Sequence, residues 1–162
     1  MKKVCFFLLS LAFASASFAA DDATVVHWKT LKGVISAPGT SNLVAGIQSG
    51  LIPWTTTGGA VQVNLSTGDA VFTVQGLVFN GGNASGTPGA INMIKGTLVC
   101  NPGTTAQAIL DGAAVPLSAG GDAHFSGNIG SVPSPCSAPV FLIRIVPVDR
   151  WIATGAVRIG GE

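Results

Sequence analysis

The stretch VQVNLSTGDAVFTVQGLVF, from Val61 to Phe79, decides the fold class of this chain. In its first part, apolar Val61, Val63 and Leu65 alternate with polar residues, which is the period of a half-buried β-strand. The turn-forming residues STGD follow, and the apolar residues then resume. The stretch predicts a β-hairpin whose return strand, 70–79, is covered on both sides at the centre of a sheet.

The rest of the chain repeats this layout. Gly and Pro interrupt short pieces that are rich in Val, Ile, Thr, Phe and Trp, which is typical of many short strands. We expect further strands at 24–36 with a bulge at Gly33, at 43–47, 91–100, 123–129, 140–146 and 151–159. We also expect a turn at Gly58-Gly59, and a second hairpin over 107–117 around the turn Asp111-Gly112. The pattern predicts an all-β, antiparallel β-sandwich of about 8–10 short strands, with a small barrel as the alternative.

Residues 1–19 have the layout of a secretory signal peptide: two lysines, a short apolar run and then small residues. Cleavage after Ala19 fits best, and cleavage after Ala16 is the competitor. The apolar run is shorter than the roughly 20 residues that span a membrane. We therefore expect an exported protein, periplasmic or extracellular, whose residues 20–162 form a single domain without a transmembrane segment.

The composition of the mature chain limits its partners. Cleavage of the signal peptide after Ala19 removes two of the eight basic residues and none of the seven acidic residues. Thirteen charged side chains remain, and the net charge changes from +1 to −1. Nucleic acids and anionic membranes require clustered cations, so neither is an expected partner. A surface with so little charge favours association, and we expect a protein or glycan partner or a homo-oligomer.

Two cysteines, Cys100 and Cys136, remain after cleavage of the signal peptide. An even pair in an oxidising compartment predicts one disulfide. Their wide spacing is unlike that of zinc motifs. The bond would fasten the Pro-rich segment 132–139 to the end of the strand 91–100.

The longest segment without expected secondary structure is NGGNASGTPGA, Asn80 to Ala90. Long loops in compact domains are often functional, so this one is the first candidate binding surface, with the region of Trp54 as the second. The candidate binding residues are Asn80, Asn83, Ser85 and Trp54.

Residues that could carry catalysis are few. His27 and His124 are the only histidines; they could meet across a sheet and bind a metal together with Asp22 or Asp122. Ser85 and Ser126 lack the G-x-S-x-G frame of a nucleophile elbow. Neither a catalytic nor a cofactor-binding constellation is expected. A hydrolase or metal-dependent enzyme using His27 or His124 is the alternative function.

The arginines allow two interpretations. Arg144, Arg150 and Arg158 could form a small cationic site near Trp151. Pairing of Arg144 with an acid such as Asp149 is the more ordinary arrangement for a lone arginine in a strand.

The segments VNLSTGDAVFTVQGLV and PLSAGGDAHFSG, together with FLIRI and WIATGAVR, resemble small secreted bacterial proteins of unknown function. A fainter resemblance is to the CHRD domain, whose repeats also run from a strand through Gly-Leu and a Gly-rich turn to a strand. These resemblances imply a secreted β-sandwich and carry no site residue over to this chain. We expect a non-enzymatic binding or structural domain associated with the cell envelope.

Overall fold

The computed structural model describes residues 24–37 and 39–160, and these residues form strands and turns without any helix. The predicted signal peptide and Asp22 lie outside the described residues. The strands are β1 (Val25–Gly33), β2 (Leu43–Val44), β3 (Ile47–Gln48), β4 (Trp54–Thr55), β5 (Gly58–Asn64), β6 (Asp69–Gln75), β7 (Val78–Phe79), β8 (Met93–Cys100), β9 (Ala108–Asp111), β10 (Val115–Pro116), β11 (Ala123–Asn128), β12 (Val140–Ile145) and β13 (Trp151–Ile159). Within this part of the chain, no helix is long and apolar enough to cross a membrane.

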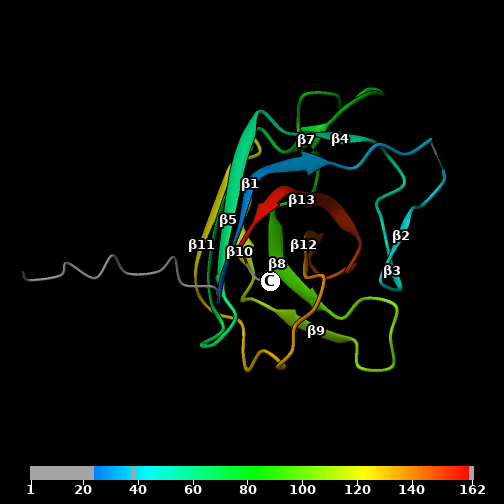
Figure 1. Cartoon of the computed structure of the whole chain (residues 1–162). Helices are drawn as coiled ribbons and strands as arrows, with labels where there is room; N and C mark the ends of the chain where they lie inside the picture. The colour runs from blue at the N-terminus through cyan, green and yellow to red at the C-terminus, as the bar shows by residue number, and fades with distance from the viewer. Residues whose placement is uncertain (1–23, 38, 161–162) are drawn as a thin grey trace, which may run out of the picture.

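Nine strands form one continuous antiparallel sheet in the order β10-β8-β12-β13-β1-β5-β6-β11, with β9 also paired to β8. The sheet curls around the core, so that β5 and β11 lie opposite β8 and β12 (Figure 1). Its end strands β10 and β11 come into contact. The prediction of an all-β antiparallel fold is confirmed, and the two layers come from a single curled sheet. The ladders β2-β3 and β4-β7 stand apart from it.

The hairpin that decides the fold class is present as β5 and β6, with Val63 opposite Ala70 and Val61 opposite Phe72. The return strand differs from the prediction in three respects. Only alternate residues of β6 are buried, and Val71 is 40% exposed. The chain turns at Gly76, where φ is +59°, so Leu77 reaches the core from outside the strand. In addition, β6 lies next to the end of the sheet and not at its centre.

Four local predictions are also wrong. The expected strand 43–47 is a tight hairpin, because Ala45 and Gly46 both adopt positive φ between β2 and β3. The expected hairpin over 107–117 is absent, because β9 and β10 do not pair with each other and both pair with the same edge of β8. Between them, the amide of Gly112 donates to Gly96 O of β8, so the chain runs on along that edge without turning back. Neither Gly33 nor the pair Gly58-Gly59 is a bulge or a turn, since all three keep strand register.

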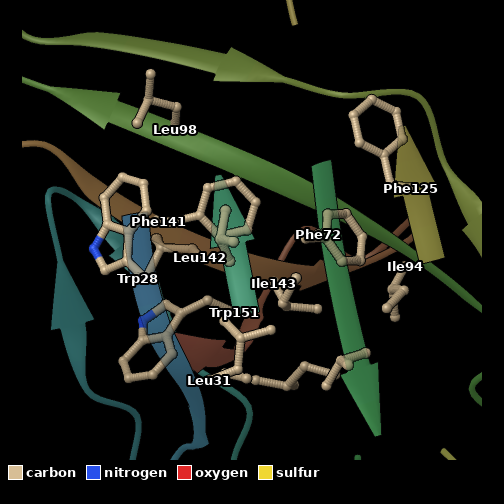
Figure 2. Packing of buried hydrophobic residues seen from close by; sticks show 14 of the residues in the cluster. Trp28, Leu31, Phe72, Ile94, Leu98, Phe125, Phe141, Leu142, Ile143 and Trp151 are labelled. Atoms are coloured by element: carbon tan, nitrogen blue, oxygen red, sulfur yellow. The ribbon is translucent and has the colours of Figure 1, made fainter. Parts of the chain in front are cut away.

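Aromatic rings join the two sides of the curled sheet. Phe141 of β12 lies 5.7 Å from Trp28 of β1 and 5.9 Å from Phe72 of β6, between ring centroids. All three are at most 3% exposed, and Figure 2 shows them together in the core. The sheet makes room for them at Gly96, where a Cβ would lie 2.6 Å from the Phe141 ring and 2.8 Å from the Phe72 ring.

The predicted disulfide joins Cys100 to Cys136, with 4.8 Å between their Cα atoms. Cys100 ends β8 and is fully buried. Backbone and side-chain bonds of Asn101 hold the same segment, because its amide donates to Ser137 O and its Nδ2 donates to Pro135 O. The Pro-rich segment is thus fastened to the sheet, as predicted.

Candidate association surface

Asn80, Asn83 and Ser85 are exposed in the loop Asn80–Ala90, at the end of the molecule where β7 and β4 pair (Figure 1). Trp54 is only 2% exposed, so its ring belongs to the core and not to the surface. It packs against Phe79 with 4.3 Å between ring centroids. Trp54 therefore supports the start of the loop from beneath, through its contact with Phe79.

The β4-β7 ladder brings the two predicted candidate regions together. Trp54 pairs with Phe79, and the amide of Asn80 donates to Pro53 O at 2.9 Å. Backbone pairing thereby joins two segments that are far apart in the sequence. On one side of the ladder lies the 80–90 loop, and on the other lies a segment that sequence reasoning did not single out.

We call this second segment, residues 34–53, the strap; its Pro38 lies outside the described residues. The strap leaves the end of β1, forms the β2-β3 hairpin and returns to β4. Four of its aliphatic side chains are exposed: Ile35 (85%), Leu43 (68%), Ile52 (46%) and Leu51 (41%). Single exposed aliphatic residues are normal, but four within one segment make the strap a candidate interaction surface.

Neither the strap nor the 80–90 loop contains an ionisable side chain. No Asp, Glu, Lys, Arg or His occurs between Lys32 and Asp69 or between Asp69 and Lys95. This absence of charge was visible in the sequence and is the signal that could have located the strap. The sequence alone did not show that this uncharged segment lies on the surface, and so the absence of charge could not be interpreted.

The strap is fixed to the sheet by backbone bonds. The amides of Val34 and Gly50 donate to Ile152 O and Trp151 O, each at 2.8 Å. Arg150 donates from its guanidinium to Ser49 O at 2.9 Å. A segment held in this way loses little conformational freedom when a partner binds, so more of the contact energy appears as affinity.

The two histidines do not converge. His27 lies on β1 and His124 on β11, with β5 and β6 between them. Three inter-strand spacings separate the strands by about 14 Å, whereas two imidazoles on one zinc ion each lie about 2 Å from the metal. Among residues 24–37 and 39–160, no group of three or more His, Cys, Asp or Glu side chains could hold a metal ion.

Neither of two large hollows in the described part of the chain holds a histidine together with an acid. The first, of about 660 Å³, is lined by His27 and Lys29 among others but by no acid. The second, of about 600 Å³, lies beside the disulfide and is lined by Pro133, Pro135, Cys136 and Arg158 among others. Its lining, as far as the structure describes the chain, contains hydroxyl groups and one cation but neither an acid nor a histidine. Such a lining lacks the base that a serine nucleophile requires.

The three arginines have separate partners and do not form a cationic site. Arg144 pairs with Asp111 at 3.1 Å and with Asp149 at 3.5 Å. Arg150 binds Ser49 O, and Arg158 donates to Pro139 O at 3.3 Å. The interpretation that paired Arg144 with Asp149 is the correct one.

Lys95 completes a four-residue ion-pair network on β8, β9, β12 and the turn before β13. Its Nζ lies 2.8 Å from Asp111 and 2.7 Å from Asp149. Burial favours neutral forms, but the ion pairs outweigh it, so the pKa of Lys95 is raised and the pKa of Asp111 is lowered. The positive charges of Lys95 and Arg144 cancel the negative charges of Asp111 and Asp149. The network is therefore a structural feature.

We expect Asp111→Asn to lower the free energy of unfolding by about 1–2 kcal/mol at neutral pH, after a discount for the partial exposure of Asp111. The pKa of Asp111 is lowered by folding, so its contribution is present above about pH 4 and is lost as pH falls through the folded-state pKa. Urea unfolding at several pH values measures this. The difference between variant and parent should shrink in acid, and a constant difference would contradict the assignment.

Comparison of the chain with protein-family models, with curated proteins and with solved structures finds no match.

Proposed function

We propose that this protein is an exported, non-enzymatic β domain, periplasmic or extracellular, that acts by associating with another protein. The N-terminal pattern supports export, and the disulfide between Cys100 and Cys136 suits an oxidising compartment. The observation that carries the association is the uncharged surface formed by the strap and the 80–90 loop, with its four exposed aliphatic side chains.

Burial of this surface would stabilise a complex by the hydrophobic effect. Full burial of an exposed Ile or Leu side chain contributes about 1.5–3 kcal/mol before the costs of association are subtracted. Exposed polar backbone and amide groups in the 80–90 loop would supply hydrogen bonds at the rim. A partner of this kind would itself present an apolar, weakly charged surface.

The chemistry of the surface favours a protein over a glycan. Sugar rings are commonly held by stacking on exposed aromatic rings, and the chain has no tyrosine. Trp28, Trp54 and Trp151 are all at most 5% exposed. Aliphatic side chains pack well against other aliphatic and aromatic side chains, and so a protein, including a second copy of this chain, suits the surface better.

The double variant Ile35→Glu/Leu43→Glu tests this proposal. We expect it to abolish association, because two buried, unpaired carboxylates would be placed in the interface. The control is Val71→Glu/Ile159→Glu, which changes two exposed aliphatic residues, 40% and 46% exposed, on strands of the main sheet. Light scattering of the purified proteins and co-purification with envelope fractions are the measurements.

Both double variants should fold like the parent, since exposed substitutions usually change stability by no more than about 0.5 kcal/mol each. If the strap variant associates as well as the parent, or if only the control loses association, the proposed surface is wrong.

A further inference from the structure

The 80–90 loop contains the only Asn-Gly pair in the chain, Asn80-Gly81. The other asparagines are followed by Leu, Ala, Met, Pro or Ile. Because glycine has no Cβ, its backbone nitrogen can approach the preceding side-chain amide with the least steric hindrance. Exposed loop tips are also where disorder and proteolytic cleavage of the backbone concentrate.

The structure leaves this pair open to reaction. Asn80 and Gly81 are both exposed. Gly81 adopts φ of +133°, and no atom lies within 4 Å of the position where a Cβ would stand. We propose that Asn80 is a site of spontaneous deamidation and isoaspartate formation, a chemical modification that places the first negative charge on the 80–90 loop.

The reaction needs only water. The Gly81 backbone nitrogen gives up its proton to solvent base and attacks the side-chain carbonyl carbon of Asn80. A carbon–nitrogen bond forms, and the side-chain nitrogen leaves as ammonia. Water then opens the resulting succinimide ring at either carbonyl, which yields aspartate or isoaspartate at position 80.

Ser85 controls the rate. The nucleophile in this reaction is the Gly81 nitrogen, and its N–H donates to Ser85 Oγ at 3.1 Å. The loop is closed around this contact by bonds from the Phe79 amide to Thr87 O and from the Gly86 amide to Phe79 O, both at 3.0 Å. A hydrogen-bonded N–H is held in one orientation, so Ser85 slows the attack without preventing it.

Asp111-Gly112 is an internal comparison, because an Asp-Gly pair can form the same succinimide. There the amide of Gly112 donates to Gly96 O at 2.8 Å within the edge of β8. The Asp111 carboxylate accepts from Thr97 at 2.6 Å and pairs with Lys95. Both reacting groups are held by the fold, so we expect no isoaspartate at Asp111 in the folded protein.

The test is incubation of the folded protein in mildly alkaline buffer at physiological temperature, followed by tandem mass spectrometry. Replacement of NH2 by OH adds one mass unit, which should appear at Asn80 and not at Asn83, which is also an exposed asparagine of the same loop. Ser85→Ala should react several-fold faster than the parent, whereas Gly81→Ala should be nearly inert. In denaturant the Ser85→Ala and parent chains should react at the same rate.

Equal, slow reaction at Asn80 and Asn83 would overturn the proposal. An unchanged rate in folded Ser85→Ala would overturn the assigned role of Ser85. The chemistry does not depend on the proposed association. If association does use this surface, the modified protein, separated by anion exchange, should bind more weakly than the unmodified one.

Discussion

Phe141→Ala is expected to lower the free energy of unfolding by about 3–5 kcal/mol. The ring is 1% exposed and contacts Trp28 and Phe72, so it joins three strands that are distant along the sheet. Its removal would leave a cavity that side chains from a curled sheet cannot easily fill. Urea or thermal unfolding measures the loss, and Val148→Ala, at a 60% exposed site, is the control that should change little.

A variant at Gly96 distinguishes the loss of close packing around Phe141 from a general loss of buried hydrophobic surface. Gly96→Ala alone should destabilise the fold by about 1–3 kcal/mol, because its methyl group would press on Phe141 and Phe72. Combined with Phe141→Leu, the same methyl group should cost less, since the closest ring is gone. Additive effects of the two changes would contradict the packing described for this position.

Cys136→Ser is expected to destabilise the protein by about 4 kcal/mol, the chain-entropy value for a closed loop of this length. The sequence separation of the two cysteines is 36. The folded loop should keep its place, because Asn101 still bonds to Pro135 and Ser137. The loss therefore arises chiefly in the unfolded chain, and association through the strap should be retained under mild conditions.

The controls for the disulfide are simple. Reduction of the parent protein should reproduce the loss of stability, and Cys100→Ala/Cys136→Ser should match it without leaving a buried free thiol at Cys100. Equal melting temperatures for parent and Cys136→Ser would contradict the stabilising role of the bond.

Local patterns predicted those features that depend on alternation along one strand. The faces of β5 and β11 follow from Val63 and Phe125 being apolar between polar neighbours, and both are buried. The bounds of β13 were predicted because its apolar residues are bracketed by Asp149-Arg150 and the terminal glycines. The disulfide followed from counting cysteines.

Features that depend on distant contacts could not be predicted. Trp54 looked like a surface residue because it stands between Pro53 and a run of threonines, yet pairing of β4 with β7 buries it. The same ladder places the strap beside the 80–90 loop, and no local pattern encodes that pairing. His27 is half-buried and His124 is exposed, and only the strand order reveals that two strands separate them.

The most direct test of the proposed association surface is site-specific photo-crosslinking in producing cells. A photoreactive amino acid at Ile52 of the strap and one at Asn83 of the loop should each form adducts with the same partner. One at His124, exposed on β11 at the other side of the sheet, should form none. Adducts at His124 with none at Ile52 or Asn83 would contradict the account.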